Sequence, residues 1–258
     1  MLPAGTFEGR VAMVTGGGSG IGRAIAAELA RLGATVVVLG RTAAKLDETV
    51  AAIRAGGGRA HACAVDVRDR DAVARAVGLV VAEHGRVDHL VNSAAGNFRV
   101  APEDMSPNAW DAVVQIVLHG TWHCTQLVGQ HLIARDSPGS ILNLGSTMAS
   151  RGGPDTVHSA SAKAGVATMT RSLAAAWGPH GIRINVLVPG TTDGTAGMQA
   201  LHASSTGEGR DPAAAIPLRR LGTTEEVAHA ATFLLSDYAS YVTGASLTMD
   251  GGRSLGQL

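Results

Sequence analysis

The sequence predicts one α/β domain built on a seven-stranded parallel sheet with helices on both faces. Short runs of apolar, β-branched residues alternate along the chain with longer segments whose apolar residues recur at helical spacing. A glycine-rich turn joins the first apolar run to the first helical segment, which is typical of a doubly wound, Rossmann-like fold. A chain of 258 residues suits a single domain of this class.

The apolar runs predict seven strands. Their continuous valine, isoleucine and leucine content is typical of strands that are buried on both faces of a parallel sheet. They cover residues 10–15, 35–39, 60–65, 89–92, 140–145, 183–188 and 246–249.

The segments with helical spacing predict six helices between these strands. They cover residues 21–32, 43–55, 70–84, 108–135, 158–177 and 224–235. Glycine follows several of them directly, as at Gly33 and Gly85, and glycine is a common helix terminator. The segment 108–135, introduced by Ser106 and Pro107, is expected to be one long helix.

One region breaks the alternation of strands and helices. Residues 189–217 are rich in glycine, threonine, serine and alanine and show no period. A loop of this length is either disordered or a functional lid. Because it follows the sixth strand at the edge where ligands bind in open sheets, we favour a lid over residues 190–217.

Composition and charge disfavour several classes of protein. With 21 basic and 21 acidic residues, the chain lacks the excess positive charge of a nucleic-acid binder. No apolar run is long enough for a membrane span, and the first ten residues do not resemble a signal peptide. Cys63 and Cys124 form no disulfide framework. We therefore expect a cytoplasmic protein without nucleic-acid or membrane partners.

The histidines show no spacing that completes a metal site. His123, His131 and His158 lack nearby carboxylates at suitable positions in the sequence. We therefore expect no metal.

The glycine-rich turn reads TGGGSGIG over residues 15–22. Glycine allows a tight turn and lets backbone N–H groups approach a pyrophosphate at the following helix N-terminus. A strand precedes this turn and a helix follows it, which is the context that a dinucleotide site requires. The expected cofactor contacts here are Gly16, Gly18, Ser19, Gly20, Ile21 and Gly22.

Arg41 follows the second strand, where NAD-binding folds usually carry an acidic residue for the ribose. An arginine there pairs with a 2′-phosphate, which favours NADP(H); the alternative is a solvated surface arginine. Turns after the third and fourth strands are expected to complete the cofactor groove. The residues concerned are Asp66, Val67, Asn92, Ala94, Ala95 and Gly96.

Taken together, these motifs resemble those of the short-chain dehydrogenase/reductase superfamily over essentially the whole chain. They are TGGGSGIG, NSAAG at 92–96, Ser146, SASAK at 159–163 and the PG at 189–190. Four stretches are similar to the narrower group of 2,4-dienoyl-CoA reductases, in both the mitochondrial and the peroxisomal branches. They are AAGNF at 94–98, SPNAW at 106–110, SASAKAGV at 159–166 and SDYAS at 236–240.

The resemblance implies roles for individual residues. Lys163 would bind the nicotinamide ribose, and Asn97 would hold the thioester carbonyl of an acyl-CoA substrate. Phe98 would pack on the acyl chain, and Arg68 would reach the CoA phosphates. The nicotinamide turn would be formed by Pro189, Gly190 and Thr192. The resemblance also implies a homotetramer in which residues 239–252 pack between subunits.

One departure from the superfamily pattern concerns the proton donor. The usual pattern has a tyrosine four residues before the lysine, but this position is Ser159. Ser146 stands thirteen residues before Ser159, at the usual serine position. A serine hydroxyl is a far weaker acid than a phenol of pKa about 10, so ordinary ketone reduction is disfavoured. The two tyrosines, Tyr238 and Tyr241, lie far along the chain.

Reduction of a conjugated dienoyl thioester needs less acid strength, because charge collects on the thioester oxygen and hydrogen-bond donors stabilise it. Two signature donors are nevertheless replaced, since Met148 stands for the mitochondrial tyrosine and Val117 for the peroxisomal aspartate. His119, at a helix position where relatives place a catalytic asparagine, either donates to the oxyanion, relays a proton with Lys163, or only fills space.

Three hypotheses follow from these residues. The first is NADPH-dependent reduction of a conjugated acyl-CoA of the 2,4-dienoyl type, supported by Asn97 and Lys163. The second is a short-chain dehydrogenase/reductase for another carbonyl or enoyl substrate, using Ser146 with His119 or Ser159. The third is a non-catalytic NADP-binding sensor.

Overall fold

The computed structural model describes residues 1–195 and 211–255 and confirms the expected fold class. Seven parallel strands form one sheet in the order β3-β2-β1-β4-β5-β6-β7. The strands are β1 (Val11–Thr15), β2 (Thr35–Gly40), β3 (Arg59–Ala64), β4 (His89–Asn92), β5 (Gly139–Leu144), β6 (Ile182–Pro189) and β7 (Ser246–Met249). Each predicted strand is present, with ends within about a residue of those expected.

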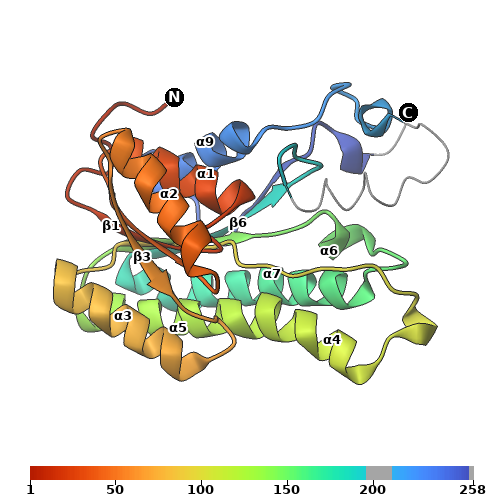
Figure 1. Cartoon of the computed structure of the whole chain (residues 1–258), viewed down its shortest axis with the longest axis horizontal. Helices are drawn as coiled ribbons and strands as arrows, with labels where there is room; N and C mark the ends of the chain where they lie inside the picture. The colour runs from red at the N-terminus through yellow and green to blue at the C-terminus, as the bar shows by residue number, and fades with distance from the viewer. Residues whose placement is uncertain (196–210, 256–258) are drawn as a thin grey trace.

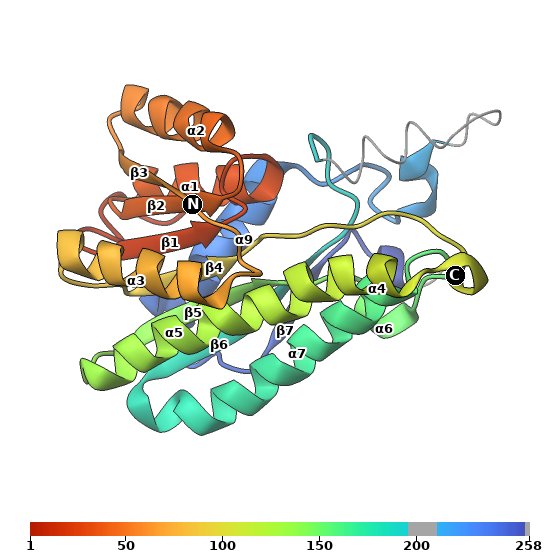
Figure 2. The same cartoon turned by 60° about the horizontal axis from the view of Figure 1, so that its bottom comes forward.

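Helices cover both faces of the sheet (Figure 1). α1, α2 and α9 lie on one face, and α3, α5 and α7 lie on the other, as a second view also shows (Figure 2). The helices are α1 (Gly20–Arg31), α2 (Ala43–Ala55), α3 (Arg70–His84), α4 (Pro107–Val114), α5 (Gly120–Ala134), α6 (Met148–Arg151), α7 (Val157–Trp177) and α9 (Thr224–Leu235). Among the described residues, no helix has the length and hydropathy to span a membrane.

The two layers of helices enclose two hydrophobic cores. One core joins α1 and α9 to the sheet through fully buried residues such as Leu29, Ala231 and Val14. The other lies on the opposite face, where α3 and α5 contribute Val73 and Val128. Burial of each large apolar side chain contributes about 1.5–3 kcal/mol, so these cores fix the strand edges from which the site is built.

The two edge strands differ from the predicted pattern of continuous burial. Side chains of β3 alternate between buried and more exposed positions, and those of β7 are mostly exposed. An edge strand has a neighbour on one side only, and its helix covers it incompletely. The inner strands β1 and β4 are buried along their whole length, as expected.

The predicted long helix over residues 108–135 is interrupted. A π-helical turn at Gln115–His119 separates α4 from α5, although the three segments continue along one direction (Figure 2). A π-turn accommodates one extra residue and widens the helix locally. The short helix α6, directly after β5, is a further element that the sequence analysis did not predict.

The position of the site follows from the strand order. The chain moves outward from β1 to β2 and β3, and then returns to the other side of β1 to form β4. The loops after β1 and β4 therefore diverge at the carboxyl edge of the sheet, where open α/β sheets bind ligands. The Thr15 hydroxyl accepts hydrogen bonds from the backbone N–H groups of Ser93 and Ala94, each at 3.1 Å, and holds the two loops together.

Candidate active site

The turn between β1 and α1 is packed too closely for residues larger than glycine, as Gly16 and Gly22 show. A Cβ atom on Gly22 would lie 2.3 Å from the Gly16 carbonyl oxygen, and one on Gly16 would lie 2.9 Å from the Ala94 nitrogen. Gly16 also has a φ of +66°, in the left-handed region that favours glycine. The side chain of Ser19, the residue before α1, caps no helix N–H group. This turn fits the pyrophosphate of a dinucleotide, as the sequence predicts.

A cavity extends from this turn along the carboxyl ends of β2 and β3. It gathers eight of the expected cofactor residues, and it adds Lys45 from α2 to the expected Arg41. Arg41 and Lys45 give the cavity two cations where an NADP 2′-phosphate would bind. The lining residues are Gly16, Gly18, Ser19, Gly40, Arg41, Thr42, Lys45, Leu46, Val65, Asp66, Val67, Ala94, Ala95 and Ile116.

Arg68 is tied to Asp66 at the far end of this cavity. Its guanidinium donates to both carboxylate oxygens of Asp66, from Nε at 3.0 Å and from Nη2 at 2.5 Å. These hydrogen bonds lower the pKa of the Asp66 carboxyl and keep it ionised. Because Asp66 lines the cavity, the pair places a positive group, Arg68, at its exposed rim.

Asn92 and Gly96, two further expected cofactor residues, lie beside this cavity. The buried Asn92 amide donates to Thr125 at 2.9 Å and to Asn143 at 2.8 Å, so its side chain joins β4 to α5 and β5. A Cβ on Gly96 would lie 3.0 Å from the Ile116 side chain, which lines the cavity. Asn92 thus supports the loop that carries Ala94 and Ala95, and faces away from solvent.

Lys163 is buried in α7 at the carboxyl end of β5. Its Nζ donates a short hydrogen bond to the carbonyl oxygen of Leu144, the last residue of β5. Burial lowers the lysine pKa to about 8. Ser159 precedes it by one helical turn and so lies on the same side of α7. The serine therefore stands where the usual tyrosine would lie.

Ser146 follows β5 by two residues and lies in the same region. Its hydroxyl accepts a hydrogen bond from the Met148 N–H at 3.2 Å, at the start of α6. The same residue lines a second cavity, which is formed between α7 and β7. That cavity is lined by Ser146, Thr147, Ala149, Ser150, Ala164, Ala167, Thr168, Arg171, Val188, Ser246, Thr248 and Ser254.

The loop after β4 presents Asn97 and Phe98 at the surface. Asn97 is exposed, and Phe98 keeps 41% of its surface accessible. The Phe98 ring packs edge-on against His158, with ring centroids 4.7 Å apart. His158 is fully buried, and neither ring nitrogen has a hydrogen-bond partner among the described residues. The sequence analysis did not assign His158 to the site, although it directly precedes Ser159.

His119 lies at the junction between the π-turn and α5. It is exposed at the end of the π-turn, and its ring faces His123 at a centroid distance of 6.4 Å. The His123 Nδ1 atom lies 3.0 Å from the carbonyl oxygen of Val67, a residue that lines the cavity containing Arg41. Val117, by contrast, is buried against Val166 of α7. The π-turn therefore directs an apolar side chain toward α7.

Gly190 and Thr192, which the resemblance places at the nicotinamide, lie in the turn after β6. Thr192 is buried, and its hydroxyl donates to the Gly190 carbonyl at 3.1 Å. A Cβ on Gly190 would lie 2.6 Å from Asp250, so the backbone after Pro189 runs directly against the end of β7. Of the predicted lid over 190–217, residues 196–210 lie outside the described part of the chain.

The two tyrosines lie away from Lys163. Tyr238 and Tyr241 are 63% and 102% exposed, respectively, in the segment that leads from α9 into β7. The chain enters β7 from this segment, which therefore lies at the amino edge of the sheet, whereas Lys163 contacts the carboxyl end of β5. Neither phenol can donate a proton beside Lys163.

Comparison with known sequences gives matches over nearly the whole chain. The family described as "Enoyl-(Acyl carrier protein) reductase" matches residues 16–254. A probable 2,4-dienoyl-CoA reductase of Bacillus subtilis (strain 168) is 44% identical over 250 residues, which cover 96% of this chain and 98% of that protein.

Solved structures show the same fold with different activities in their names. A short chain dehydrogenase from Bacillus anthracis is 40% identical, with a TM-score of 0.88, and the match covers 97% of this chain and 98% of the other. A putative NAD(P)-dependent gluconate 5-dehydrogenase from Beutenbergia cavernae, solved with bound NADP, is 38% identical with a TM-score of 0.89, over 95% and 97% of the two chains.

Proposed function

Because the chain belongs to the short-chain dehydrogenase/reductase superfamily and is an NAD(P)-dependent oxidoreductase, we propose that it reduces a conjugated acyl-CoA thioester of the 2,4-dienoyl type with NADPH. The observation that carries the proposal is that the buried Lys163 lies one helical turn from Ser159, whereas both tyrosines of the chain lie at the opposite edge of the sheet. Similarity to the probable 2,4-dienoyl-CoA reductase supports the same substrate class.

The residues that line the cavity containing Arg41 fit the adenosine half of NADPH. Arg41 and Lys45 would hold the 2′-phosphate, the turn at Gly16 would bind the pyrophosphate, and Lys163 with Thr192 would hold the nicotinamide end. When bound, NADPH supplies the hydride. A ribose with a free 2′-hydroxyl offers no charge to these two cations, so we expect NADPH to bind more tightly than NADH.

The absence of a phenol beside Lys163 determines which substrate suits the site. Reduction of an isolated ketone needs a proton on oxygen as hydride arrives at carbon, and Ser159 is too weak an acid for this. In a dienoyl thioester, the arriving hydride forms a C–H bond at the distal end of the conjugated chain. The displaced electron pair moves through the chain to the thioester oxygen, which gains negative charge.

The site would then stabilise that oxygen through hydrogen bonds. The Asn97 amide and the Ser146 hydroxyl are neutral donors, each contributing about 3–4 kcal/mol where the oxyanion forms. The Lys163 ammonium adds positive charge. The thioester carbonyl re-forms when a carbon of the chain takes a proton from water. Arg68, which is paired with Asp66 of the cofactor cavity, would reach the CoA phosphates, and the exposed Phe98 would pack on the acyl chain.

The direct test is substrate-dependent oxidation of NADPH, followed by absorbance. We expect NADPH oxidation with a 2,4-dienoyl-CoA and none with an isolated ketone. We also expect no reduction of NADP when gluconate is offered as the substrate of the reverse reaction. Turnover of the ketone or of gluconate instead would favour another carbonyl substrate. Tight NADPH binding without turnover of any conjugated carbonyl would favour the sensor hypothesis.

Asn97→Ala tests the assigned oxyanion donor. We expect kcat with a dienoyl-CoA to fall about 100- to 1,000-fold because one hydrogen bond to the developing oxyanion is lost, while NADPH affinity stays unchanged. Asn108→Ala, at an exposed position at the start of α4, serves as the control. Equal turnover by the two variants would remove Asn97 from the mechanism.

A further inference from the structure

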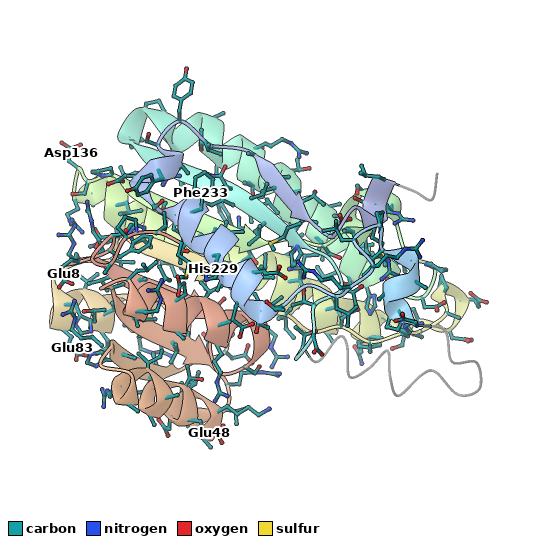
Figure 3. The ribbon with its side chains drawn as sticks, turned by 90° about the horizontal axis from the view of Figure 1, so that it is seen from above. Glu8, Glu48, Glu83, Asp136, His229 and Phe233 are labelled. Atoms are coloured by element: carbon teal, nitrogen blue, oxygen red, sulfur yellow. The ribbon has the colours of Figure 1, made fainter. Side chains whose placement is uncertain are left out.

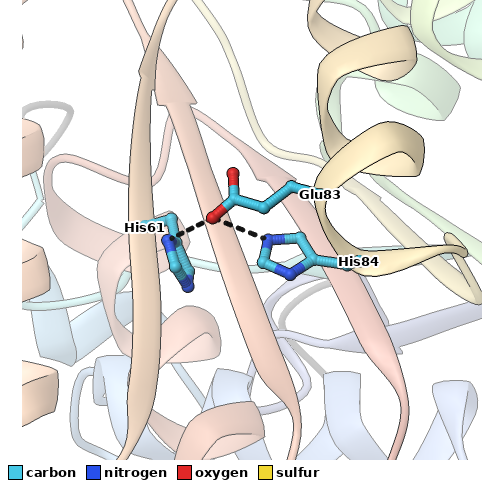
Figure 4. A group of neighbouring side chains, drawn as sticks. All are labelled: His61, Glu83 and His84. Atoms are coloured by element: carbon cyan, nitrogen blue, oxygen red, sulfur yellow. Dashed lines mark ion pairs between the residues drawn. The ribbon is translucent and has the colours of Figure 1, made fainter.

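Three potential metal ligands meet between the edge strand β3 and the end of α3 (Figure 4). His61 lies in the middle of β3, and Glu83 and His84 are the last two residues of α3. The Glu83 Oε1 atom lies 3.4 Å from His61 Nδ1 and 3.9 Å from His84 Nε2. One ligand atom from each of the three residues lies within 4.8 Å of the others.

The shorter of these separations matches the spacing of ligands around a tetrahedral metal ion, and the 3.9 Å separation is longer. With metal–ligand bonds of about 2.0–2.1 Å, two ligand atoms at a tetrahedral angle lie about 3.4 Å apart. Two imidazoles and one carboxylate form a donor set that suits Zn²⁺ and leaves a fourth position for water. Side-chain rotations that shorten the longer separations would place all three atoms on one ion.

A second observation points to a missing ligand at this position. The His84 Nε2 atom is buried and has no hydrogen-bond partner among the described residues, although Glu83 lies beside it. An unpaired buried ring nitrogen is unfavourable, and metal coordination would satisfy it. The position at the C-terminus of α3 also favours a cation, because the helix dipole is negative at this end.

We propose that His61, Glu83 and His84 form a binding site for a divalent transition metal of the Zn²⁺ class. The site lies apart from the cofactor cavity, because α3 runs back toward the amino ends of the strands before it ends at His84. Glu83 projects from the same edge of the molecule as Glu8, which precedes β1 (Figure 3). Bound metal would tie the edge strand β3 to α3, so its expected effect is on stability.

No metal was expected from the sequence because His123, His131 and His158 show no metal-site spacing, and His61 and His84, which lie more than twenty residues apart along the chain, were not considered. Adjacent residues Glu83 and His84 show no recognised spacing by themselves, and only the fold brings His61 to them.

The test is calorimetric titration of the untagged, EDTA-treated full chain with Zn²⁺, together with thermal unfolding. We expect one Zn²⁺ per chain, with micromolar affinity, and a Tm that rises with Zn²⁺ concentration. His61→Ala should weaken binding at least 10-fold. His229→Ala is the matched control, because His229 also stands next to a glutamate, Glu28 at 3.9 Å, but the structure gives it no second histidine. Its affinity should equal that of the parent chain.

Glu83→Gln, a change at an exposed side chain, provides a second variant if His61→Ala unfolds, and should also weaken binding at least 10-fold. Co²⁺ in place of Zn²⁺ should give the visible absorption of a tetrahedral site in the parent chain and in His229→Ala only. The proposal is overturned if no binding occurs at submillimolar Zn²⁺, or if the His61 and His229 variants bind equally.

Discussion

The Lys163 ammonium lies where burial disfavours its charge. Its pKa falls from 10.5 to about 8, so in the folded protein the group carries less charge near pH 8 than it would in the unfolded chain. The hydrogen bond to Leu144 only partly offsets the loss of water. A charged group retained at such a position is typical of a functional site, where charge serves the ligand rather than the fold.

Lys163 predicts a characteristic dependence on pH. Between the folded pKa of about 8 and the unfolded value of 10.5, the unfolded chain binds more protons, so unfolding free energy rises with pH. The rise in unfolding free energy amounts to about 3 kcal/mol in total. The burial of Lys163 therefore destabilises the folded protein most below pH 8. Over the same range, kcat/KM should fall as the ammonium loses its proton.

Both measurements use Lys163→Met as the reference. The free energy of unfolding in urea and kcat/KM are measured between pH 7 and 10 for the two proteins. In the variant, the free energy of unfolding should lack the rise with pH that Lys163 causes, and kcat/KM should lack the corresponding fall. Identical slopes in the two proteins would mean that Lys163 does not titrate in this range.

Arg41 predicts the choice of coenzyme. Arg41→Ala should weaken NADPH binding about 10- to 100-fold, because a charge-assisted hydrogen bond to the 2′-phosphate is lost, and should leave NADH binding unchanged. Arg75→Ala, on the exposed face of α3, is the control for the loss of one positive charge. Fluorescence titration with each coenzyme measures the effect. Equal weakening toward NADPH and NADH would place Arg41 away from the phosphate.

Single residues show both the reach and the limit of sequence reasoning. Arg41 was predicted because it directly follows a strand, and the cavity contains it. Lys45 escaped prediction because a lysine in the first turn of an ordinary helix carries no signal until α2 is placed over β2. His158 escaped for a similar reason: burial against Phe98 depends on how a distant loop folds back.

The close packing of the β1–α1 turn predicts that an added methyl group there will weaken coenzyme binding. Gly22→Ala would bring a methyl group to 2.3 Å from the Gly16 carbonyl oxygen and distort the turn, so NADPH affinity should fall at least 10-fold. Gly78→Ala in α3 meets no atom within 4 Å and should stabilise the helix by about 0.5–1 kcal/mol without affecting NADPH. Coenzyme titration and urea unfolding of both variants check this. Unchanged NADPH affinity in Gly22→Ala would show that the turn can move.

Elements were predictable to the extent that their signal is local. Each strand could be predicted from its own apolar run, and the parallel orientation of the strands follows from the helices that connect them. The π-turn at Gln115–His119 was missed because this segment carries apolar residues on most of its sides, so a change of face after one extra residue does not stand out in the sequence. The four-residue helix α6 is too short to show a period at all.

The exposed edge strand β7 carries a prediction for the whole molecule. Leu247 in this strand keeps 38% of its surface accessible, and an uncovered edge strand is a site for pairing or packing with another chain. We expect a homotetramer in which residues 239–252 are covered by a second copy. Light scattering of the parent chain and of Leu247→Lys tests this: the variant should have a smaller mass. A monomeric parent chain would contradict the expectation.

The reversal of strand order beside β1 also has a practical consequence for redesign. The two cations proposed to select the coenzyme, Arg41 and Lys45, follow β2, whereas most residues proposed to meet the substrate lie in loops after β4 and β5, with Arg68 after β3 as the exception. In the sheet, β1 separates the end of β2, which leads to Arg41 and Lys45, from the ends of β4 and β5, which lead to Asn97 and Ser146. Coenzyme preference and substrate range can therefore be engineered in separate libraries and recombined, because gains in one half should transfer intact to the other.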